Sequence, residues 1–227
     1  MKVTYLYHSG FMVEEENTVL IFDYFKGELP EFDENKQVYV FASHRHYDHF
    51  KKKIYDWKEK YPNITYILSD DIPSKKYMDH TVFIGPNSER EIGSIKVRTL
   101  KSTDEGVAFL VYAQGKTLYH AGDLNWWHWE EEGNVYNEMM KRNYQYGISK
   151  IEGEHIDAAF VPVDPRLGDQ FYYGLDWFMR HTETEHVFPM HFWGKCFICG
   201  EIKNHPEATQ YRDKIEEITG ENQVFVL

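Results

Sequence analysis

Cysteine is scarce in this chain. Only two cysteines occur among 227 residues, Cys196 and Cys199, in a single CxxC run. A secreted disulfide framework uses more, so we expect two structural or incidental thiols in a reduced cytoplasm. A redox pair and a metal site are the alternatives, although a structural zinc needs two further ligands and only His205 lies close by in the sequence.

Long apolar runs and basic charge are lacking as well. No run approaches the roughly 18–20 apolar residues of a membrane-spanning helix, and the N-terminus lacks the apolar core of a secretory signal. The formal net charge is −12, whereas nucleic-acid binding draws on a basic surface. We therefore expect a cytoplasmic protein that binds neither nucleic acid nor membrane. A small, even anionic, substrate remains compatible with this charge, and the oligomeric state stays open.

The hydrophobic pattern predicts a mixture of strands and helices in a single domain spanning residues 1–227. Strands are expected at 3–7, 19–23, 37–42, 64–68, 81–84, 94–100, 107–113, 117–120, 156–163, 186–190 and 223–227. Helices are expected at 50–61, 134–150, 175–183 and 206–218. A strand-rich first half and an alternating second half predict sheets packed face to face with helices outside.

Residues 44–49 concentrate metal-ligand side chains directly after an apolar strand. Imidazole and carboxylate groups are the usual ligands of zinc and similar ions. In an extended segment His44 and His46 point the same way and can grip one ion. Asp48 and His49 lie at a bend and can reach a second position. We therefore predict a metal centre, the alternative being a loop of exposed histidines without metal.

Two other predicted strands end in ligand-type residues. The run HAGD at 120–123 places Gly122, which lets the backbone come close, before Asp123, which can bridge two ions. The run PMH at 189–191 places His191 at a later strand end. A lone Asp after Gly is more often a turn residue, but loops at strand ends commonly hold catalytic groups. The agreement of three strand ends favours one shared centre.

The run HxHxDH at 44–49, followed by Gly122-Asp123 and His191, resembles the metallo-β-lactamase superfamily. The early run HSGF at 8–11, expected on a strand, and the apolar strand ending at Asp23 are similar too. The resemblance covers essentially the whole chain. The branch that looks most similar is that of small cytoplasmic hydrolases such as L-ascorbate-6-phosphate lactonase. It implies an α/β fold, a four-layer αββα sandwich with the metal site at one edge between the sheets.

The resemblance also implies roles for individual residues. His44 and His46 would bind a first ion, Asp48, His49 and His191 a second, and Asp123 would bridge the two. Zinc is the expected ion, one or two per chain, with manganese as the alternative.

The chain departs from the family at the third histidine of the first position. The corresponding stretch, residues 100–106, has no histidine. Ser102 or Thr103 is expected in that slot, with Asp104 as an alternative ligand. The first ion would then bind loosely, be completed by water or be absent, and oxygen ligands would favour a harder ion such as manganese.

These residues predict a metal-dependent hydrolase. A bound divalent ion lowers the pKa of water from about 15.7 towards 7, and the metal-bound hydroxide attacks an acyl or phosphoryl centre. Asp48 is the expected catalytic residue, because it can orient the hydroxide as well as bind metal. The expected substrate is a small ester, lactone, thioester or phosphodiester.

Three other functions stand beside the hydrolase. A nuclease would need basic surface and added binding elements. A non-catalytic metal-binding protein is favoured by the missing histidine. A diiron oxidoreductase resembles HxExDH, whereas His46 stands at the glutamate position here.

Further residues have weaker signals. His8 is expected to orient a ligand or to be a packed strand histidine. Arg166 can meet an anionic substrate. Trp126, Trp127 and Trp129 are expected to line a substrate pocket or lid, or else to pack in the core, and His128 is a candidate proton donor. The remaining histidines of interest are expected to be surface or structural residues: His80, His155, His181, His186 and His205.

Overall fold

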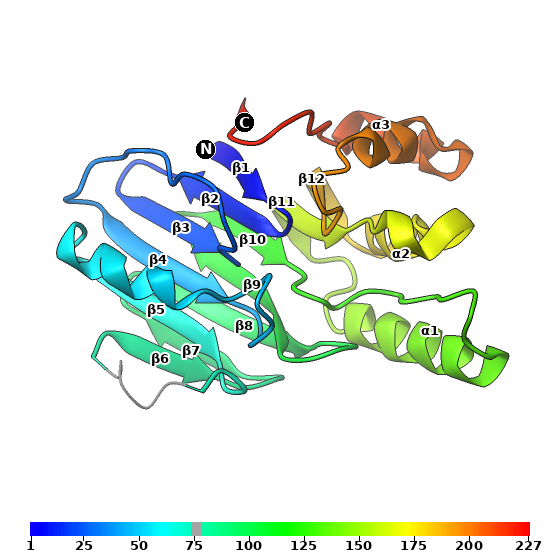
Figure 1. The fold of residues 1–227 in the computed structure, drawn as a ribbon, viewed down its shortest axis with the longest axis horizontal. Helices are drawn as coiled ribbons and strands as arrows, with labels where there is room; N and C mark the ends of the chain where they lie inside the picture. The colour runs from blue at the N-terminus through cyan, green and yellow to red at the C-terminus, as the bar shows by residue number, and fades with distance from the viewer. Residues whose placement is uncertain (74–78) are drawn as a thin grey trace.

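The computed structural model describes residues 1–73 and 79–227 and contains two mixed sheets (Figure 1). In spatial order, the first sheet consists of β13 (Val224–Val226), β1 (Lys2–Tyr7), β2 (Gly10–Glu14), β3 (Thr18–Phe22), β4 (Gln37–Ala42), β5 (Ile64–Ser69) and β6 (Thr81–Ile84). The second sheet consists of β12 (Glu183–Met190), β11 (His155–Pro162), β10 (Lys116–His120), β9 (Val107–Ala113), β8 (Ile95–Lys101) and β7 (Glu89–Ile92).

Each sheet contains both parallel and antiparallel pairs. In the first sheet β3, β4, β5 and β6 pair in parallel, and in the second sheet β10, β11 and β12 do so. The other pairs are antiparallel. Parallel strands place their carboxyl ends at one edge of a sheet, where ligands of open α/β sheets commonly bind.

Helices lie on the outer sides of the two sheets. The 3-10 helix η1 (Lys52–Glu59) covers the first sheet, and α1 (Asn134–Ser149), α2 (Tyr173–His181) and α3 (Phe197–Asn204) gather on the opposite side of the molecule (Figure 1). Side chains of these three helices share one core with the second sheet. The predicted sandwich of two sheets between helices is therefore confirmed.

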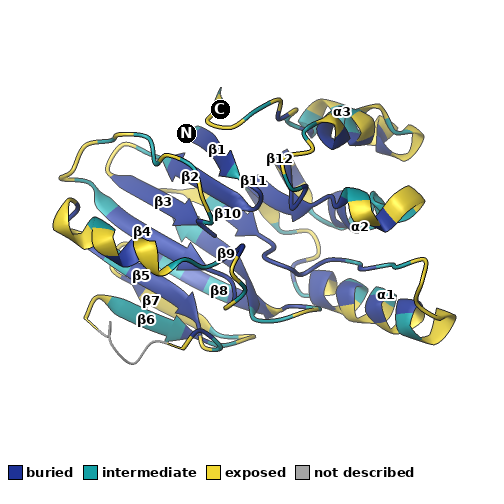
Figure 2. Cartoon of the chain, viewed as in Figure 1, coloured by how far each residue is buried: buried dark blue, intermediate teal, exposed yellow. Residues whose placement is uncertain are grey.

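Strand alternation divides the interior into two cores. In β4, Val38 and Val40 face η1, whereas Tyr39 and Phe41 face the second sheet, as expected for side chains that alternate between the faces of a strand. The central strands are buried on both faces, while the outer surfaces of the helices are exposed (Figure 2).

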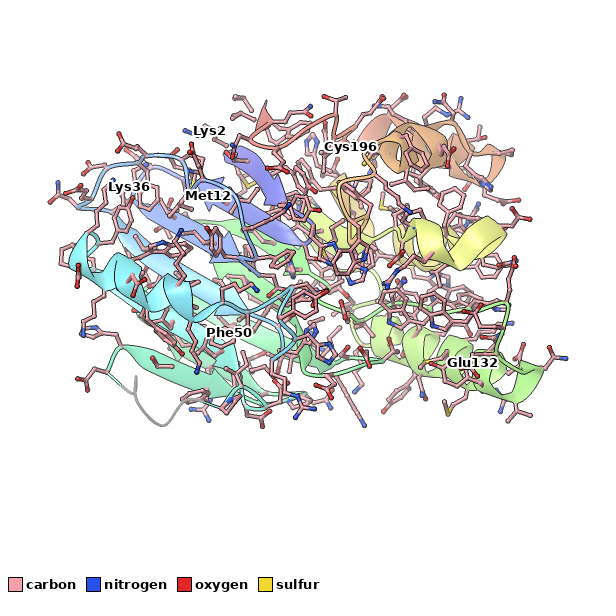
Figure 3. All side chains as sticks on the ribbon, in the orientation of Figure 1. Lys2, Met12, Lys36, Phe50, Glu132 and Cys196 are labelled. Carbon is pink, nitrogen blue, oxygen red and sulfur yellow. The ribbon has the colours of Figure 1, made fainter. Side chains whose placement is uncertain are left out.

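Aromatic rings hold the two sheets together. The buried ring of Phe160 on β11 lies 4.4 Å from Phe11, 5.3 Å from Phe188 and 5.8 Å from Phe22, measured between centroids. Such offset and tilted pairs add to the free energy gained by burying the rings. Figure 3 shows side chains filling the space between the ribbons.

Several sequence predictions missed an element. Strand β2 was not predicted, because a two-residue turn at His8 and Ser9 separates it from β1, so residues 8–11 do not lie on one strand. Strand β7 was missed because its sequence, EREI, is polar and mostly exposed, and its pairing with β8 defines it. Helix α3 was missed because it begins inside the CxxC run and contains Gly200.

The helix predicted at 206–218 is wrong. Two short 3-10 helices, η3 (Pro206–Gln210) and η4 (Arg212–Lys214), occupy its first part. Beyond them Ile215 bridges Val187 of β12, and the N–H of Glu216 donates to the Val187 carbonyl at 2.9 Å. Pairing with a sheet edge therefore replaces the helix. The helix predicted at 50–61 is the shorter η1, in which the adjacent residues Ile54 and Tyr55 are buried.

Both cysteines are free thiols; Cys196 directly precedes α3 (Figure 3), and Cys199 lies within it. Burial raises the pKa of the Cys199 thiol to about 12, which disfavours a reactive thiolate. Among the described residues no helix is long and apolar enough to span a membrane.

The inter-sheet aromatic core predicts a large stability cost for Phe160→Ala. Truncating this ring should lower the free energy of unfolding by about 3–5 kcal/mol, measured by urea denaturation. The matched control is Phe197→Ala, because Phe197 is 59% exposed and its loss should change stability by less than about 0.5 kcal/mol. Equal effects of the two substitutions would contradict this account of the core.

Candidate metal centre

The predicted ligand residues meet where parallel strands of both sheets end. His44 follows β4, Asp123 follows β10 and His191 follows β12. The structure gathers all six predicted ligands, together with His8, into two neighbouring groups of donor atoms. That they bind metal remains a prediction, but the three strand ends singled out in the sequence do lie together in the structure.

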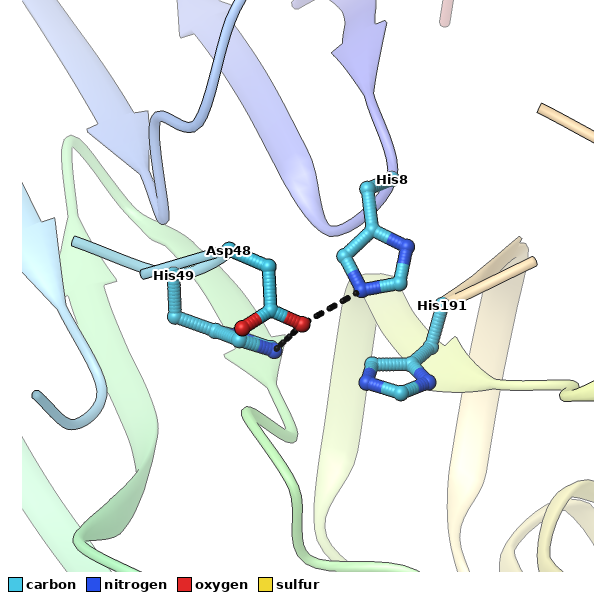
Figure 4. Close-up of side chains that lie close together, drawn as sticks. All are labelled: His8, Asp48, His49 and His191. Carbon is cyan, nitrogen blue, oxygen red and sulfur yellow. Dashed lines mark ion pairs between the residues drawn. The ribbon is translucent and has the colours of Figure 1, made fainter. Parts of the chain in front are cut away.

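The donor atoms of each group lie within 4.8 Å of one another. We call His8, Asp48, His49 and His191 the inner group (Figure 4) and His44, His46 and Asp123 the outer group. Every side chain of the inner group is buried, whereas the His46 side chain of the outer group is 41% exposed.

Three buried side-chain atoms of the centre lack a hydrogen-bond partner within the described chain: His8 Nε2, His49 Nε2 and Asp123 Oδ1. The last two lie 3.2 Å from each other. Buried polar atoms are normally paired. A divalent cation near His49 Nε2 and Asp123 Oδ1 would satisfy both atoms and offset the carboxylate charge. The residues present therefore fit a metal ion.

Carboxylates orient two of the three buried imidazoles of the inner group. His49 Nδ1 lies 2.7 Å from Asp23 Oδ2, and His191 Nδ1 lies 2.8 Å from Asp164 Oδ2. A carboxylate accepts the Nδ1 proton, so in the neutral form of each ring the lone pair is on Nε2 and faces the centre. This pairing is the usual support of a metal-binding histidine.

The outer imidazoles are oriented by different partners. Ser43 Oγ donates to Asp23 Oδ2 at 2.6 Å and therefore accepts from His44 Nδ1 at 3.0 Å. His46 is turned the other way, with Nδ1 2.9 Å from His44 Nε2 and Nε2 3.4 Å from a Glu105 carboxylate oxygen. His44 thus presents Nε2, and His46 presents Nδ1.

His8 lies against Asp48. Its Nε2 is 3.3 Å from Asp48 Oδ2 (Figure 4), and its Nδ1 accepts a long hydrogen bond, 3.4 Å, from the N–H of Trp193. A neutral His8 with Nδ1 as acceptor carries its proton on Nε2, so it faces Asp48 as a donor. This arrangement suits the orienting role predicted from the sequence better than metal ligation.

The charges of the centre are strongly coupled. Burial lowers the pKa of His49, but the carboxylates of Asp123, Asp23 and Asp48 outweigh it and raise this pKa to about 9. Burial and the neighbouring His49 lower the pKa of His44 to about 4.

The pKa values of two carboxylates of the centre are shifted in opposite directions. Burial would raise the pKa of Asp123, yet His49, His191 and His44 hold it below its ordinary value. Burial and the charge of Asp123 raise the pKa of Asp104. The outer side of the centre therefore has an excess of negative charge.

The backbone of the centre is strained where it approaches itself closely. His8, Asp23 and His191 have φ values of 59°, 42° and 65°, a region that non-glycine residues rarely adopt. Gly122 has φ 52°, and a Cβ there would lie 2.6 Å from Ser43 Cβ. The predicted close approach at Gly122 is confirmed.

A pocket of about 440 Å³ opens over the metal centre. Its lining joins residues of both donor groups to Asp104, Arg166 and an aromatic set, Tyr47, Trp127, Trp129, Tyr136 and Trp193. Trp127 also donates from its indole N–H to the Asp123 carbonyl at 3.0 Å. Trp127 and Trp129 thus line the pocket and also pack in a small hydrophobic cluster with Met140 and Leu167; that the pocket binds a substrate stays a prediction.

Other sequence candidates lie elsewhere. Trp126 packs against Tyr173 and Trp177 beside the core. His128 contacts Tyr173 and is not among the described residues that line the pocket. His181 contacts the Trp177 carbonyl, His186 pairs with Glu216, His205 caps η3, and His80 and His155 are exposed, so these five are surface or structural residues as predicted.

Asp164 is the supporting residue that sequence reasoning gave no role. It lies at a strand end before Pro165, which was a weak signal of proximity to the centre. Its carboxylate accepts from His191 and from the Arg166 guanidinium, at 2.9 Å for Arg166 Nε, and these contacts, against burial, hold its pKa at about 2. It therefore stays ionised and fixes both side chains.

This geometry predicts that Asp164→Asn weakens metal binding. The amide cannot accept the His191 proton as a carboxylate does, so metal affinity should fall about 10–100-fold, measured by competition with a chromophoric chelator. Asp157→Asn is the control, because Asp157 lies on β11, the strand that precedes Asp164, and pairs with Lys116, away from the centre. An unchanged affinity in the Asp164 variant would argue against its supporting role.

Comparison with known proteins identifies the family of this chain. Residues 2–135 match the family model of the beta-lactamase superfamily domain. A UPF0173 metal-dependent hydrolase of Desulforamulus reducens is 27% identical over 218 residues, covering 85% of this chain and 84% of that protein. One of Alkaliphilus metalliredigens is 31% identical over 140 residues, 54% of this chain and 63% of that protein.

Solved structures agree in fold. Igni18, a metallo hydrolase of the archaeon Ignicoccus hospitalis, superposes with a TM-score of 0.66 at 19% identity, covering 100% of this chain and 98% of that one. The family model spans the run 44–49 and Asp123, and the fold supplies the strand end that holds His191. The chain therefore belongs to the metallo-β-lactamase superfamily.

Proposed function

We propose that this chain, a metal-dependent hydrolase of the metallo-β-lactamase fold, cleaves a small ester, lactone or phosphodiester that carries an anionic group. The observation that carries the proposal is the pocket over the centre. Among the described residues that line it, Arg166 is the one Lys or Arg. The pocket volume of about 440 Å³ suits a small molecule rather than a polymer.

Arg166 is held in place on several sides. Asp164 engages its Nε and one terminal nitrogen, and the guanidinium lies 5.6 Å from the Trp129 ring and 5.5 Å from the Trp193 ring. An arginine fixed in this way loses little conformational entropy when it binds an anion. The second terminal nitrogen is left to meet a carboxylate or phosphate of the substrate.

The aromatic residues of the pocket complement this cation. Trp127, Trp129 and Trp193 provide flat apolar surface beside Arg166. They suit the ring or carbon chain of a substrate. The finer resemblance, to L-ascorbate-6-phosphate lactonase, makes phosphorylated lactones the first substrates to test.

Metal and carboxylate share the chemical step. A divalent metal, when bound, polarises the attacked oxygen and makes water a stronger acid. Asp48 lies at the base of the pocket, and contacts with His8 and His49 outweigh its burial and hold its pKa low. It therefore stays a carboxylate that can accept a hydrogen bond from the attacking water. His8 holds this carboxylate in position from the opposite side.

The proposal predicts that Arg166→Gln selectively impairs anionic substrates. The kcat/KM for a phosphorylated or carboxylated lactone should fall about 10–100-fold, as expected for the loss of a charge-assisted hydrogen bond, whereas a neutral ester of equal size should be little affected. Steady-state kinetics on metal-loaded protein measure both.

Two controls accompany this experiment. Arg142→Gln removes an equal charge from the exposed surface of α1 and should leave both substrates unaffected. Metal content is compared in parallel, because Arg166 also contacts Asp164. Equal losses for the neutral and anionic substrates would refute the anion-binding role. Absence of turnover by metal-loaded wild type across lactones, esters and phosphodiesters would favour the non-catalytic alternative.

A further inference from the structure

We propose that the metal centre has two unequal positions: an inner one that fills first, and an outer one in which Asp104 replaces the missing histidine. The inference rests on the proposed function only in assuming that the bound ions serve hydrolysis. Four observations support it: the division of the Asp123 carboxylate, the burial of the inner group, the exposure of His46 in the outer group, and the hydrogen bonding of residues 102–104.

The Asp123 carboxylate divides its two oxygens between the groups. Oδ1 lies 3.2 Å from His49 Nε2 and 3.4 Å from His191 Nε2. Oδ2 lies 3.5 Å from His44 Nε2. One oxygen therefore faces each group, which is the arrangement of a carboxylate that bridges two ions. The centre is built for two positions, although the chain lacks one histidine.

The inner position is assembled before metal arrives. The adjacent residues Asp48 and His49 converge with His191, which comes from a separate segment (Figure 4), and all three are at most 7% exposed. Both of its imidazoles are fixed by buried carboxylates through Nδ1. An ion there meets donors that need little reorganisation and displaces little ordered water, which favours tight binding.

The outer position is less prepared. His44 is buried, but the His46 side chain is 41% exposed, and its outward nitrogen contacts Glu105, which is itself 33% exposed. Solvent competes with such contacts, so they hold the ring less firmly. With His44, His46 and one oxygen of Asp123, this position has three donors and needs a fourth.

Hydrogen bonding decides which residue of 102–104 supplies that donor. Thr103 Oγ1 lies 2.7 Å from the Asn125 carbonyl, which accepts its proton, and accepts from the Asn125 N–H at 3.0 Å. Ser102 Oγ accepts from the N–H of Asp104 at 3.1 Å. The Thr103 hydroxyl is thus engaged by the loop of Asn125, and the Ser102 hydroxyl by its own loop.

Asp104 lies beside the outer position, next to the described donor atoms of His44, His46 and Asp123 that lie within 4.8 Å of one another. Its Oδ2 lies 3.9 Å from His46 Nδ1, the atom that approaches His44 Nε2 to 2.9 Å. Donor atoms about 3–4 Å apart can share one ion at ordinary bond lengths near 2.1 Å. Asp104 also lines the pocket, so water and substrate reach this position readily.

The substitution changes the chemistry of the outer position. Two imidazoles and two carboxylates replace the three imidazoles and one carboxylate implied by the family pattern. Oxygen donors favour harder ions such as Mn²⁺ and lower the advantage of Zn²⁺. The outer position should therefore exchange its ion readily and discriminate weakly between these two metals.

Titration of metal-free protein with Zn²⁺, and separately with Mn²⁺, tests the inference. Calorimetry gives the affinities, and elemental analysis after dialysis counts the bound ions. We expect two equivalents of unequal affinity in the wild type. Asp104→Asn should weaken the second equivalent at least about tenfold and leave the first unchanged. Asp104→His should tighten the second equivalent for Zn²⁺ more than for Mn²⁺.

The controls separate this assignment from its rivals. Ser102→Ala tests the neighbouring hydroxyl, and Glu131→Gln removes an equal charge from an exposed position. Neither should change the second equivalent. A single equivalent in the wild type, loss of the first equivalent in Asp104→Asn, or an equal effect of Ser102→Ala would each overturn the inference. Hydrolysis is a separate readout: two unequal equivalents without turnover would overturn the proposed function alone.

Discussion

The buried carboxylate of Asp23 is the contact on which the metal centre depends. It accepts hydrogen bonds from the Ser43 N–H at 2.7 Å, from the Ser43 hydroxyl at 2.6 Å and from His49 Nδ1 at 2.7 Å. A fully buried ionised carboxylate persists only when such partners replace water. Through His49 it orients the inner group, and through Ser43 it orients His44 of the outer group.

The fold explains why so many charges gather at one edge. β3 and β4 of the first sheet, and β10, β11 and β12 of the second, end at the centre and are followed there by Asp23, His44, Asp123, Asp164 and His191. Parallel pairing aligns these ends, and face-to-face packing of the sheets brings the two rows together. The aromatic core around Phe160 holds the sheets at this spacing, so packing and chemistry are coupled.

The centre also stores strain. Residues held in left-handed backbone conformations cost about 1–3 kcal/mol each, and His8, Asp23 and His191 all adopt them. The hydrophobic sandwich stabilises these conformations, and their effect is to aim side chains inward from tight turns. Gly122 extends the same principle, because its missing Cβ lets the loop of Asp123 touch Ser43.

The sequence by itself determined the class of this protein. The four ligand-type residues within 44–49, and Asp123 and His191 at two further strand ends, can be recognised from their spacing along the chain without knowing how the strands pack. The helix predicted at 134–150, observed as α1 (Asn134–Ser149), was likewise recognisable from its local pattern. The sequence also shows directly that residues 100–106 contain no histidine.

Tertiary structure decided everything that depends on which distant atoms meet. It placed Asp164 behind His191 and Asp104 beside His46, and it separated Trp127 in the pocket from Trp126 beside the core. It also replaced the predicted last helix with pairing at the edge of β12. Hydrogen bonds and burial between segments far apart in the chain leave no periodic signal in sequence, because their geometry exists only once both sheets have packed.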